Sequence, residues 1–580
     1  MKTYNKLFIL ALILFAFNAC DQNYIDGISA VDPGADETAP QVTINFPPEG
    51  YEIQTNDAVA SVDIDFEVRD DIEIGSISVN IDGAEIASYS EFMDYRVAMR
   101  TYTYDNVTTG SHVLSVTATD LDGKTTTATV NFAKSPPYVP QYEGEVFYMP
   151  FNNEFREMNS LQLATAVGSP GFTDGIQGGT AYSGAADSYL TFPTTILQGA
   201  TEVSASFWLK VDASMDRAGI LVVSPPADND NDRSKGFRFF RENASGMQRF
   251  KLNAGNGESD SWFDGGAAAD VEPSTGEWTH FAFSISETSA EVYINGELVK
   301  EGDFSGIDWT DCDVISIMSG APNWTGWNHL SDGSLMDELR IFNTALTQEE
   351  IHTIMLKEQA SFYMDFNGDF KEAISSEEAT VVGNPSLNYG AGVEGDAYQG
   401  AADSYLSFST ADVDIQADEF SASFWVNINA TPDRAGILVM GPEDADNPDA
   451  QNDRTSGFRF FRENAGGMQR FKLNAGNGTA DSWFDGGTAA DVDPTTGNWV
   501  HMAFAISGTE ARVYIDGVEV KQGDFSGIDW TGCDLLSIMS GAPRFNGWNH
   551  NSDESMMDEL YLFKKALSAE EVVLMMQDGL

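Results

Sequence analysis

The sequence predicts an all-β protein built from three β-sandwich domains, and three observations lead to this fold class. Residues 37–134 contain short runs of alternating apolar and polar residues, such as "VASVDIDFEV" and "HVLSVTATDLDG", with Asp-Gly turns between them. Strands about ten residues apart with such turns are typical of a sandwich. Residues 146–357 and 361–580 then repeat one another, because "DRAGIL", "GDFSGIDWT", "IMSGAP" and "GWNH" each occur twice. Aromatic residues make up 12% of the chain, which is typical of packed domains and not of disorder.

The first residues predict export. The stretch "MKTYNKLFILALILFAFNAC" carries Lys2 and Lys6, then an apolar run that ends shortly before Cys20. This order is that of a secretory signal peptide, and it resembles the lipoprotein type, in which Cys20 becomes the acylated first residue. The alternative is an ordinary cleaved signal with an incidental cysteine. We therefore assign residues 1–20 to a signal peptide and residues 21–36 to a polar tether, with a lipid on Cys20 as the expected membrane attachment.

Composition narrows the range of partners. The chain has 31 Lys and Arg against 90 Asp and Glu, a formal net charge of -59. Because affinity for nucleic acids comes largely from cationic contacts with phosphates, this balance argues against nucleic acid as a partner. No stretch after the signal is long and apolar enough to span a bilayer. Cys312 and Cys533 occupy matching positions, one in each repeat, so we expect two small buried thiols and no disulfide within a domain.

The motifs of the two repeats resemble a known fold family. In the first repeat "AYSGAADSYLTF", "SASFWLKV", "GEWTHFAFSISETSAEVYINGELV" and "SLMDELRIFNTALTQEEI" follow in this order, and the second repeat has their counterparts. This order resembles the laminin-G-type, concanavalin A-like jelly roll. The resemblance implies two tandem jelly rolls at residues 146–357 and 361–580, each ending in a helix. Residues 37–134 resemble a bacterial immunoglobulin-like (Ig-like) domain, and residues 135–145 form a Pro-rich linker.

The whole layout resembles surface glycan-binding lipoproteins of outer-membrane polysaccharide uptake systems, of the SusE/SusF kind. This resemblance implies a lipid-anchored, cell-surface protein of the outer membrane. Such a protein captures polysaccharide without catalysis, beside an outer-membrane transporter and further glycan-binding lipoproteins. Two alternatives stay open: a glycoside hydrolase or polysaccharide lyase of the same fold, and a surface adhesin that binds protein. The fold alone does not choose among them, because it serves lectins, glycanases and adhesion modules alike.

Candidate catalytic residues are sparse. Glycanases of this fold carry a strand of alternating carboxylates, Glu-x-Asp-x-Glu or a close variant, and neither repeat contains such a string. The adjacent acids of the "MDEL" motif, Asp337 and Glu338 in the first repeat, are expected to point to opposite faces of a strand. His329 and His550 keep the lyase alternative open, since histidine is the usual proton carrier near neutral pH.

The resemblance also implies one structural Ca²⁺ in each jelly roll. Its ligands would be an aspartate on the last strand, an asparagine in an early loop, and backbone carbonyls of "SGAAD" or "QGAAD". By position the side chains are Asn152 and Asp337 in the first repeat, and Asn367 and Asp558 in the second. The family more often has aspartate in place of the asparagine, whose neutral oxygen is a weaker ligand. The alternative is that these polar side chains only cap loops.

The octapeptide "GFRFFREN" occurs in both repeats, at Gly236–Asn243 and Gly457–Asn464. As a strand it places one arginine on each face, so neither face is purely apolar. The segments "DSWFDGG" and "NWTGWNH" add tryptophan, carboxylate and amide groups near glycines. This mixture suits sugars, because flat rings stack on pyranose faces while planar polar groups bond vicinal hydroxyls.

These segments supply the predicted carbohydrate-binding residues of each repeat. In the first repeat they are Arg238, Arg241, Trp262, Asp264, Trp324, Trp327, Asn328 and His329. In the second repeat they are Arg459, Arg462, Trp483, Asp485, Phe545, Trp548, Asn549 and His550. The alternative for the arginines is a salt bridge to a local acid. The tryptophans that lie in strand patterns are expected in the core, namely Trp208, Trp278, Trp425 and Trp499.

Overall fold

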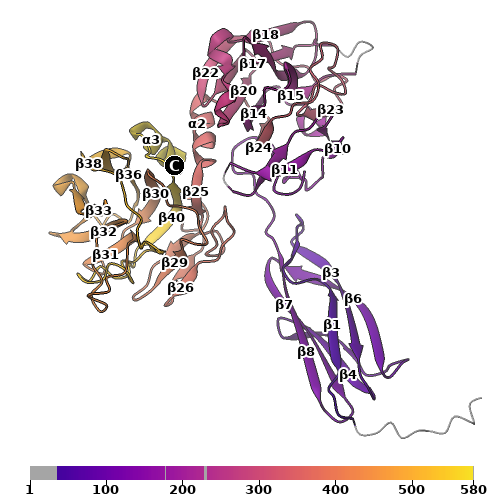
Figure 1. The fold of residues 1–580 in the computed structure, drawn as a ribbon, viewed down its shortest axis with the longest axis vertical. Helices are drawn as coiled ribbons and strands as arrows, with labels where there is room; N and C mark the ends of the chain where they lie inside the picture. Colours follow the sequence, from indigo (N-terminus) through magenta and orange to yellow (C-terminus); the bar gives the residue numbers. More distant parts are fainter. Residues whose placement is uncertain (1–35, 177, 227–230, 579–580) are drawn as a thin grey trace, which may run out of the picture. The chain divides into compact units, whose positions relative to one another are not determined.

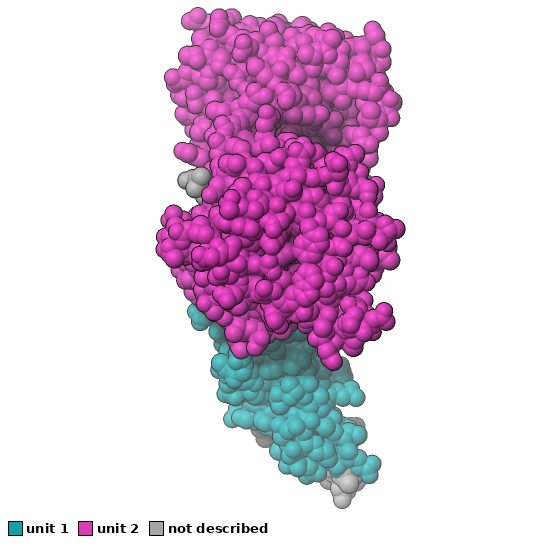
Figure 2. Space-filling model, turned by 90° about the vertical axis from the view of Figure 1, so that its left-hand side faces the viewer, with its two compact units in different colours: residues 1–138 teal, residues 139–580 magenta. Residues whose placement is uncertain are grey.

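The computed structural model describes residues 36–176, 178–226 and 231–578. The chain divides into two compact units, residues 1–138 and 139–580, which Figure 2 shows in different colours. The signal peptide, Cys20 and nearly all of the tether lie outside the described residues. Within the described ranges, no helix has both the length and the apolar character needed to cross a membrane.

The first unit contains a sandwich of two sheets, with strand orders β1-β3-β6 and β2-β8-β7-β4-β5. On β3, alternate side chains such as Ile64, Phe66 and Val68 are completely buried, which is the pattern of a strand with one face on a core. The strands are β1 (Gln41–Phe46), β2 (Tyr51–Ile53), β3 (Val59–Arg69), β4 (Ile74–Ile81), β5 (Ala84–Tyr89), β6 (Val97–Thr108), β7 (Gly110–Asp120) and β8 (Thr125–Lys134).

The second unit begins with a jelly roll of two eight-stranded antiparallel sheets (Figure 1). We call them the front sheet, with the order β10-β13-β23-β15-β16-β17-β18 and β19 beside β17, and the back sheet, with the order β11-β12-β24-β14-β20-β21-β22 and β9 beside β24. The front strands are β10 (Thr165–Val167), β13 (Tyr189–Pro193), β15 (Arg217–Val223), β16 (Phe237–Ala244), β17 (Met247–Gly255), β18 (Asp260–Asp264), β19 (Asp270–Val271) and β23 (Val314–Ile317). The back strands are β9 (Glu145–Met149), β11 (Gly171–Asp174), β12 (Thr180–Ser183), β14 (Val203–Lys210), β20 (Trp278–Ile285), β21 (Ser289–Ile294), β22 (Glu297–Asp303) and β24 (Leu335–Phe342). Short 3-10 helices lie at η1 (Thr194–Leu197), η2 (Gly266–Ala269) and η3 (Pro273–Thr275).

The second jelly roll repeats this strand order in both sheets. Its front strands are β26 (Thr380–Val382), β29 (Tyr405–Ser409), β31 (Arg434–Met440), β32 (Phe458–Ala465), β33 (Met468–Gly476), β34 (Asp481–Asp485), β35 (Asp491–Val492) and β39 (Leu535–Ile538). Its back strands are β25 (Ala360–Met364), β27 (Ser386–Asn388), β28 (Ala397–Gln399), β30 (Phe420–Asn427), β36 (Trp499–Ile506), β37 (Glu510–Ile515), β38 (Val518–Asp524) and β40 (Met556–Phe563), and η4 spans Gly487–Ala490. The predicted all-β class with two tandem jelly rolls is thereby confirmed.

The core of each jelly roll lies between its two sheets. In the first, the rings of Phe207 on the back sheet and Phe239 on the front sheet meet edge to face, with centroids 5.6 Å apart. Trp208 and Trp425 are 3% and 4% exposed, so their predicted place in the interior is confirmed. The two other tryptophans expected there, Trp278 and Trp499, are only partly buried. Both cysteines are buried thiols, as predicted.

The loop between β23 and β24, residues 318–334, folds back over the front sheet. The amide of Gly219 on β15 donates to the carbonyl of Leu330 at 3.1 Å, and a Cβ on Gly219 would lie 2.2 Å from the backbone nitrogen of Gly320. Only glycine permits so close an approach of two backbones. The glycines in "DRAGIL" and "IMSGAP" therefore place this loop, and the two tryptophans that it carries, on the sheet.

A helix closes each jelly roll, α2 (Gln348–Lys357) in the first and α3 (Ala569–Asp578) in the second. Helix α2 starts with a capping box between Thr347 and Glu350, and Glu358 follows it. The carboxylate of Glu358 accepts hydrogen bonds from Trp208 Nε1 at 2.8 Å and from Arg340 Nε at 2.9 Å. The chain is thus attached to the first jelly roll immediately before the second one begins.

Arg340 is the cation of this buried cluster. Its Nη1 lies 2.7 Å from Glu145, and the side chains of Arg340 and Glu145 are 3% and 0% exposed. Burial raises the pKa of Glu358 to about 8, because ionised carboxylates lose hydration there. The second jelly roll has Tyr561 in place of Arg340, stacked on Tyr363, so only the first repeat has this cluster.

We expect Arg340→Met to lower the free energy of unfolding of the first jelly roll by about 3–5 kcal/mol, because two buried carboxylates lose their cation. The matched change in the second repeat, Tyr561→Phe, removes only a hydroxyl and should cost about 1 kcal/mol. Urea unfolding of the full chain measures both. If both variants lost the same free energy of unfolding, the buried charge of Arg340 would not be the main source of stability at this position.

Candidate functional site

Two tryptophans lie together on the outer face of each front sheet. Trp262 on β18 and Trp327 on the β23–β24 loop have nearly parallel rings, with centroids 5.8 Å apart and 13° between planes. Each is 40% exposed. Trp483 and Trp548 repeat the arrangement at 5.8 Å and 17°, with 40% and 42% exposure. We call each pair a tryptophan platform, and the fold brings together in it residues that are 65 positions apart in the sequence of either repeat.

An arginine supports each platform. The guanidinium carbon of Arg233 lies 4.7 Å from the ring centroid of Trp327 and 5.6 Å from that of Trp262, within the range of cation–π attraction. Its Nε lies 3.2 Å from the carboxylate of Asp260. Arg454 packs in the same way in the second repeat, at 4.9 and 5.5 Å. Neither arginine is among the predicted site residues, although "NDR" recurs in the two copies two residues before "GFRFF".

A buried aromatic layer lies beneath the platform. Trp324 and His329 stack with centroids 4.2 Å apart, and Phe240 of β16 meets His329 edge to face at 4.7 Å. Trp324 is 1% exposed and His329 is 0% exposed. In the second repeat Phe545 and His550 are likewise 0% exposed. The prediction that these four loop residues bind sugar directly is corrected, because the loop turns them inward to cover the apolar outer face of the front sheet.

The burial of these histidines also bears on the lyase alternative. His329 lies 3.2 Å from the carboxylate of Glu242, and His550 lies 3.2 Å from that of Glu463. Burial lowers the pKa of His329, because the imidazolium would lose its hydration. An imidazole without solvent contact cannot exchange a proton with a bound glycan, so neither histidine is placed to act as the base of a lyase.

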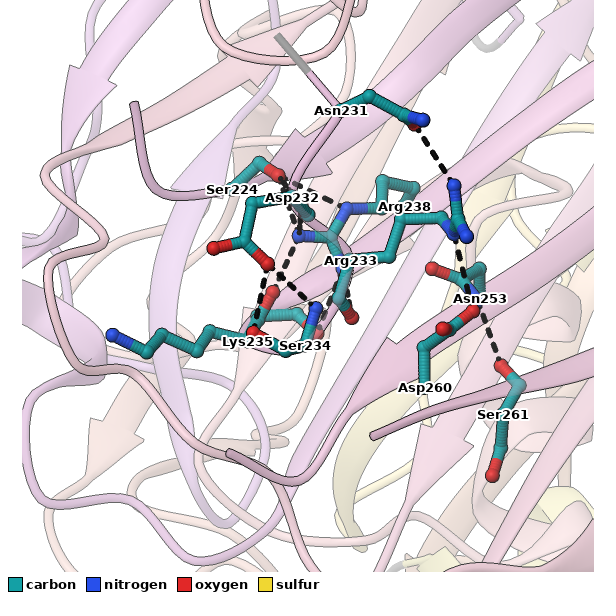
Figure 3. A network of polar contacts seen from close by, with 11 residues as sticks. Ser224, Asn231, Asp232, Arg233, Ser234, Lys235, Arg238, Asn253, Asp260 and Ser261 are labelled. Atoms are coloured by element: carbon teal, nitrogen blue, oxygen red, sulfur yellow. Dashed lines mark hydrogen bonds and ion pairs between the residues drawn. The ribbon is translucent and has the colours of Figure 1, made fainter. Parts of the chain in front are cut away.

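Arg238 is fully buried beside the platform and holds the segment that carries Arg233 (Figure 3). Its Nε donates to Ser224 Oγ at 3.0 Å, and its Nη atoms donate to the carbonyls of Asp232 at 2.7 Å and Arg233 at 3.2 Å. In the second repeat Arg459 donates to the carbonyl of Asp453, the counterpart of Asp232, and to that of Ser456, the counterpart of Lys235. The predicted contact of Arg238 and Arg459 with sugar is therefore corrected: their donors are used by backbone carbonyls inside the protein.

Arg241 is fully buried on the opposite face of β16. It forms a bidentate ion pair with Asp332 of the β23–β24 loop, with Nε 2.5 Å from Oδ2 and Nη2 3.1 Å from Oδ1. It also donates to the carbonyls of Asp212 and Met215 at 2.6 and 2.9 Å. Arg462 forms the equivalent pair in the second repeat. For these two arginines the alternative of a salt bridge to an acid is confirmed, and the predicted direct contact with sugar is corrected.

The remaining predicted residues lie at the surface around the platform. Asp264 is exposed on β18, and Lys251 on β17 bridges it to Glu242, at 3.1 and 2.9 Å. Asn328 is exposed beside Trp327 with a backbone φ of 60°. Asp485 and Asn549 take the same positions in the second repeat. The accessible part of the predicted site is therefore the platform with these carboxylates and amides.

The predicted calcium ligands lie at another place, around a glycine turn of the back sheet. Asp337 Oδ2 accepts the amide proton of Ile176 at 2.9 Å, and Asn152 Oδ1 accepts that of Thr180 at 2.9 Å. A Cβ on Gly175 would lie 2.6 Å from Asp337 Oδ2, so both oxygens bracket the same turn. In the second repeat Asp558 and Asn367 accept amide protons from the corresponding turn.

The charge state of these aspartates bears on whether a cation fits. Burial raises the pKa of Asp337 to about 8 and that of Asp558 to about 7, so each would be stabilised by a nearby positive charge. Among the described residues, however, no three acidic, histidine or cysteine side chains gather as a metal site. Carboxylate and amide oxygens are the type of donor that a hard cation takes, and here they accept protons from backbone amides.

The fold and the surface define a β-sandwich of the lectin and glucanase type. The Laminin_G_3 family, described as the concanavalin A-like lectin/glucanases superfamily, matches residues 183–352 and 399–573. These ranges cover more than half of the chain, which therefore belongs to this family. The description of this family covers both lectins, which bind sugars, and glucanases, which hydrolyse them. No curated protein sequence matches the chain.

Several solved structures are similar in part. Domain 4 of AbnA, a GH43 extracellular arabinanase from Geobacillus stearothermophilus in complex with arabinotriose, is 21% identical over 36% of this chain and 98% of that chain, with a TM-score of 0.29. Domains LG4-5 of the mouse laminin alpha1 chain are 10% identical over 66% of this chain and 88% of that chain, with a TM-score of 0.21. The binding domain of botulinum neurotoxin DC in complex with SialylT is 12% identical over 73% of this chain and 99% of that chain, with a TM-score of 0.30. Similarities this distant assign no ligand to this chain.

The Glu242 cluster predicts a dependence of stability on acid. Hydrogen bonds from His329 and Lys251 lower the pKa of Glu242 to about 2, and Glu463 has the same value. A carboxylate whose pKa is lower in the folded than in the unfolded state stabilises the folded state at pH values above the unfolded pKa of about 4.3. This stabilisation is lost as the pH falls toward the folded pKa of about 2, where the carboxylate is protonated in both states. The double variant Glu242→Gln, Glu463→Gln should therefore be less stable than wild type at pH ~6 and approach it at pH ~2. Urea unfolding at the two pH values measures the difference, and a constant difference would refute the assignment.

Proposed function

We propose that this protein is a non-catalytic polysaccharide-binding protein in which each jelly roll holds a glycan on its tryptophan platform. The proposal rests mainly on the pair of exposed, nearly parallel indole rings, which occurs in both jelly rolls with almost the same geometry. The platform tryptophans leave 40–42% of their surface exposed, and a ligand that covered them would bury this apolar area. Stacking on the apolar face of a sugar ring provides that burial.

The polar groups around the platform support a sugar as the ligand. Asp264 and Asn328 flank the rings with a carboxylate and an amide at the surface, and such planar groups bond vicinal hydroxyls. Binding without catalysis is favoured because the two histidines of the loops are buried and neither repeat has a string of alternating carboxylates. A glycanase or lyase, and an adhesin for protein, are the competing outcomes of the tests below.

The cellular setting belongs to the same proposal. The signal-like first 20 residues with Cys20 support a lipid anchor in the outer membrane, and the polar tether, Ig-like domain and Pro-rich linker would hold the jelly rolls away from the membrane. From there they would deliver glycan to an outer-membrane transporter with further glycan-binding lipoproteins. Labelling with a radioactive fatty acid, abolished by Cys20→Ala, tests the anchor.

The function is tested by electrophoresis of the full chain without its signal in gels that contain arabinan, xylan, β-glucan, mannan or polygalacturonate. Retardation by at least one polysaccharide is expected. Release of reducing sugar or of an unsaturated product from the same polymers would instead identify an enzyme. Migration that none of the polymers changes would reject the proposal.

Removing one ring of each platform should weaken binding without unfolding the protein. We expect Trp327→Ala with Trp548→Ala to reduce affinity for the retained polysaccharide by about 1–3 kcal/mol, as for other aromatic anchors. Because these rings are about 40% exposed, the melting temperature should change little. The matched control is Trp208→Phe, a buried tryptophan, which should lower the melting temperature and leave affinity unchanged. A platform variant that unfolds, or that binds as wild type does, contradicts the platform.

Calcium is proposed as a structural ion at the glycine turn of each jelly roll, near Asp337 and Asp558. A ligand that binds only the folded state stabilises it by mass action, so removal of calcium with a chelator should lower the melting temperature. The effect should be larger at pH ~9 than at pH ~6, because the raised pKa values leave the aspartates ionised only at the higher pH. Scanning calorimetry measures both. A melting temperature that a chelator does not change at either pH would show that the backbone amides alone satisfy these aspartates.

A further inference from the structure

A pocket lies next to the platform of the first jelly roll. It has a volume of about 370 Å³ and its walls include Asp187, Met215, Asp216, Arg217, Asn328 and Leu330. This volume is near the lower end of the range of about 300–1,000 Å³ for small-molecule sites. The predicted site did not include it, because its residues come from three loops that are distant in the sequence.

The pocket and the platform share structural elements. The Nη1 of Arg217 donates to the carbonyl of Trp327 at 3.0 Å, and Arg217 lines the pocket. Asn328, the residue after Trp327, lines it as well. Two residues in direct contact with Trp327, namely Arg217 and Asn328, therefore line the pocket, which places it close enough to the platform for neighbouring units of one sugar chain.

The walls of the pocket are held from inside by Arg241. Its guanidinium binds the carbonyl of Met215 at 2.9 Å and the carboxylate of Asp332, which belongs to the loop of Asn328. Asn328 and Asp187 have left-handed backbones, with φ of 60° and 54°. Hydrogen bonds inside the protein thus hold two of the loops that form the pocket.

The lining combines the two kinds of group that a sugar needs. Met215 and Leu330 provide an apolar wall, with Leu330 42% exposed. Asp187, Asp216 and Asn328 provide carboxylates and an amide for hydroxyl groups. In the second repeat the apolar wall differs, because Pro432 and Asn551 occupy the positions of Met215 and Leu330.

The charges around platform and pocket select the type of sugar. Four basic side chains near the platform are each paired with an acid: Arg217 with Glu242, Arg233 with Asp260, Arg249 with Asp270, and Lys251 with both Glu242 and Asp264. These four cations face four carboxylates, so no positive charge remains in excess among them. Asp187 and Asp216 then add two negative charges in the pocket. Recognition of a uronate requires positive potential, which this surface of an already acidic protein does not supply.

We propose that the pocket between Asp187, Asp216 and Asn328 is a second subsite of the first jelly roll, which takes a neutral sugar unit of the same glycan chain that the tryptophan platform holds. The proposal rests on the proposed function and adds to it the class of the glycan, neutral and not uronic or sulfated. It also makes the two jelly rolls unequal, because only the first has the apolar wall of Met215 and Leu330.

The test uses the full chain without its signal, with the second platform disabled by Trp483→Ala and Trp548→Ala. In this background Ala186→Tyr fills the pocket from its rim, where Ala186 is exposed, and Asp216→Ala removes one acceptor. The matched control is Ala402→Tyr, the same position in the disabled repeat. The probes are the trisaccharide and hexasaccharide of the neutral polysaccharide that the gels retain most, and hexagalacturonate. Calorimetry measures their affinities, and melting temperatures confirm that the variants are folded.

The hexasaccharide should bind about tenfold more weakly to the Ala186→Tyr variant, a loss of about 1.4 kcal/mol. We expect the platform alone to hold the trisaccharide, so the affinity for the trisaccharide should change less than about twofold, a difference below about 0.5 kcal/mol. The Ala402→Tyr control should bind as the background does, and hexagalacturonate should not bind to any variant. Unchanged hexasaccharide affinity in both pocket variants, or binding of hexagalacturonate as tight as that of the neutral probe, would overturn the proposal while the platform function stands. Failure of the wild-type chain to be retarded by any polysaccharide would instead reject the proposed function itself.

Discussion

The loops that carry the proposed binding surface of the first jelly roll depend on two guanidinium groups, Arg238 and Arg241, that have no contact with solvent. Arg238 binds the carbonyls of the segment that carries Arg233, and Arg241 joins Asp332 to the carbonyls of Asp212 and Met215. A charge without hydration is costly unless hydrogen bonds replace the water, so each loop must stay where it satisfies the arginine. Burial lowers the pKa of Arg238 to about 10, which still leaves the group charged at neutral pH. The arginines of "GFRFFREN" therefore act on a ligand only through the loops that they fix.

Comparison of the two repeats separates what the geometry requires from what can vary. The buried pair of Arg241 with Asp332 recurs as Arg462 with Asp553, and the platform angles agree within a few degrees. The surroundings differ: Gly441 replaces Ser224, and among the described atoms Arg459 Nε then has no partner. Arg544 replaces Asn323 and binds Asp534 at 2.7 Å. The buried ion pair and the platform geometry are thus the same in both repeats, while the residues at the edge of the proposed site differ. We therefore expect the two repeats to differ in which glycans they prefer.

The distribution of charge explains how so acidic a chain presents a locally balanced surface around the tryptophan platform of the first jelly roll. The front face pairs its basic residues with acids on neighbouring strands, as in the row from Asp264 through Lys251 to Glu242. The back of the first jelly roll instead gathers buried carboxylates around Arg340, where burial raises the pKa of Glu358. A net charge of -59 repels anionic polymers at long range, while the proposed binding surface itself presents rings, amides and paired charges.

The sequence by itself determined the all-β class, the duplication, the helix at the end of each repeat and the set of aromatic residues near glycines from which the platforms are drawn. These follow from local features: alternation along strands, glycine turns, and aromatic residues in glycine-rich loops that no strand pattern explains. Only the tertiary structure decided which of the neighbouring rings face solvent. Trp324 and Trp327 are three residues apart on one loop, yet one is 1% and the other 40% exposed, because the loop folds back over Phe240 and must bury one ring to cover it. The roles of Arg233, Arg238 and Arg241 were also decided by the tertiary structure. Their partners are carbonyls, a carboxylate and aromatic rings that are distant in the sequence, and strand pairing brings them close, so the sequence pattern alone does not predict these contacts.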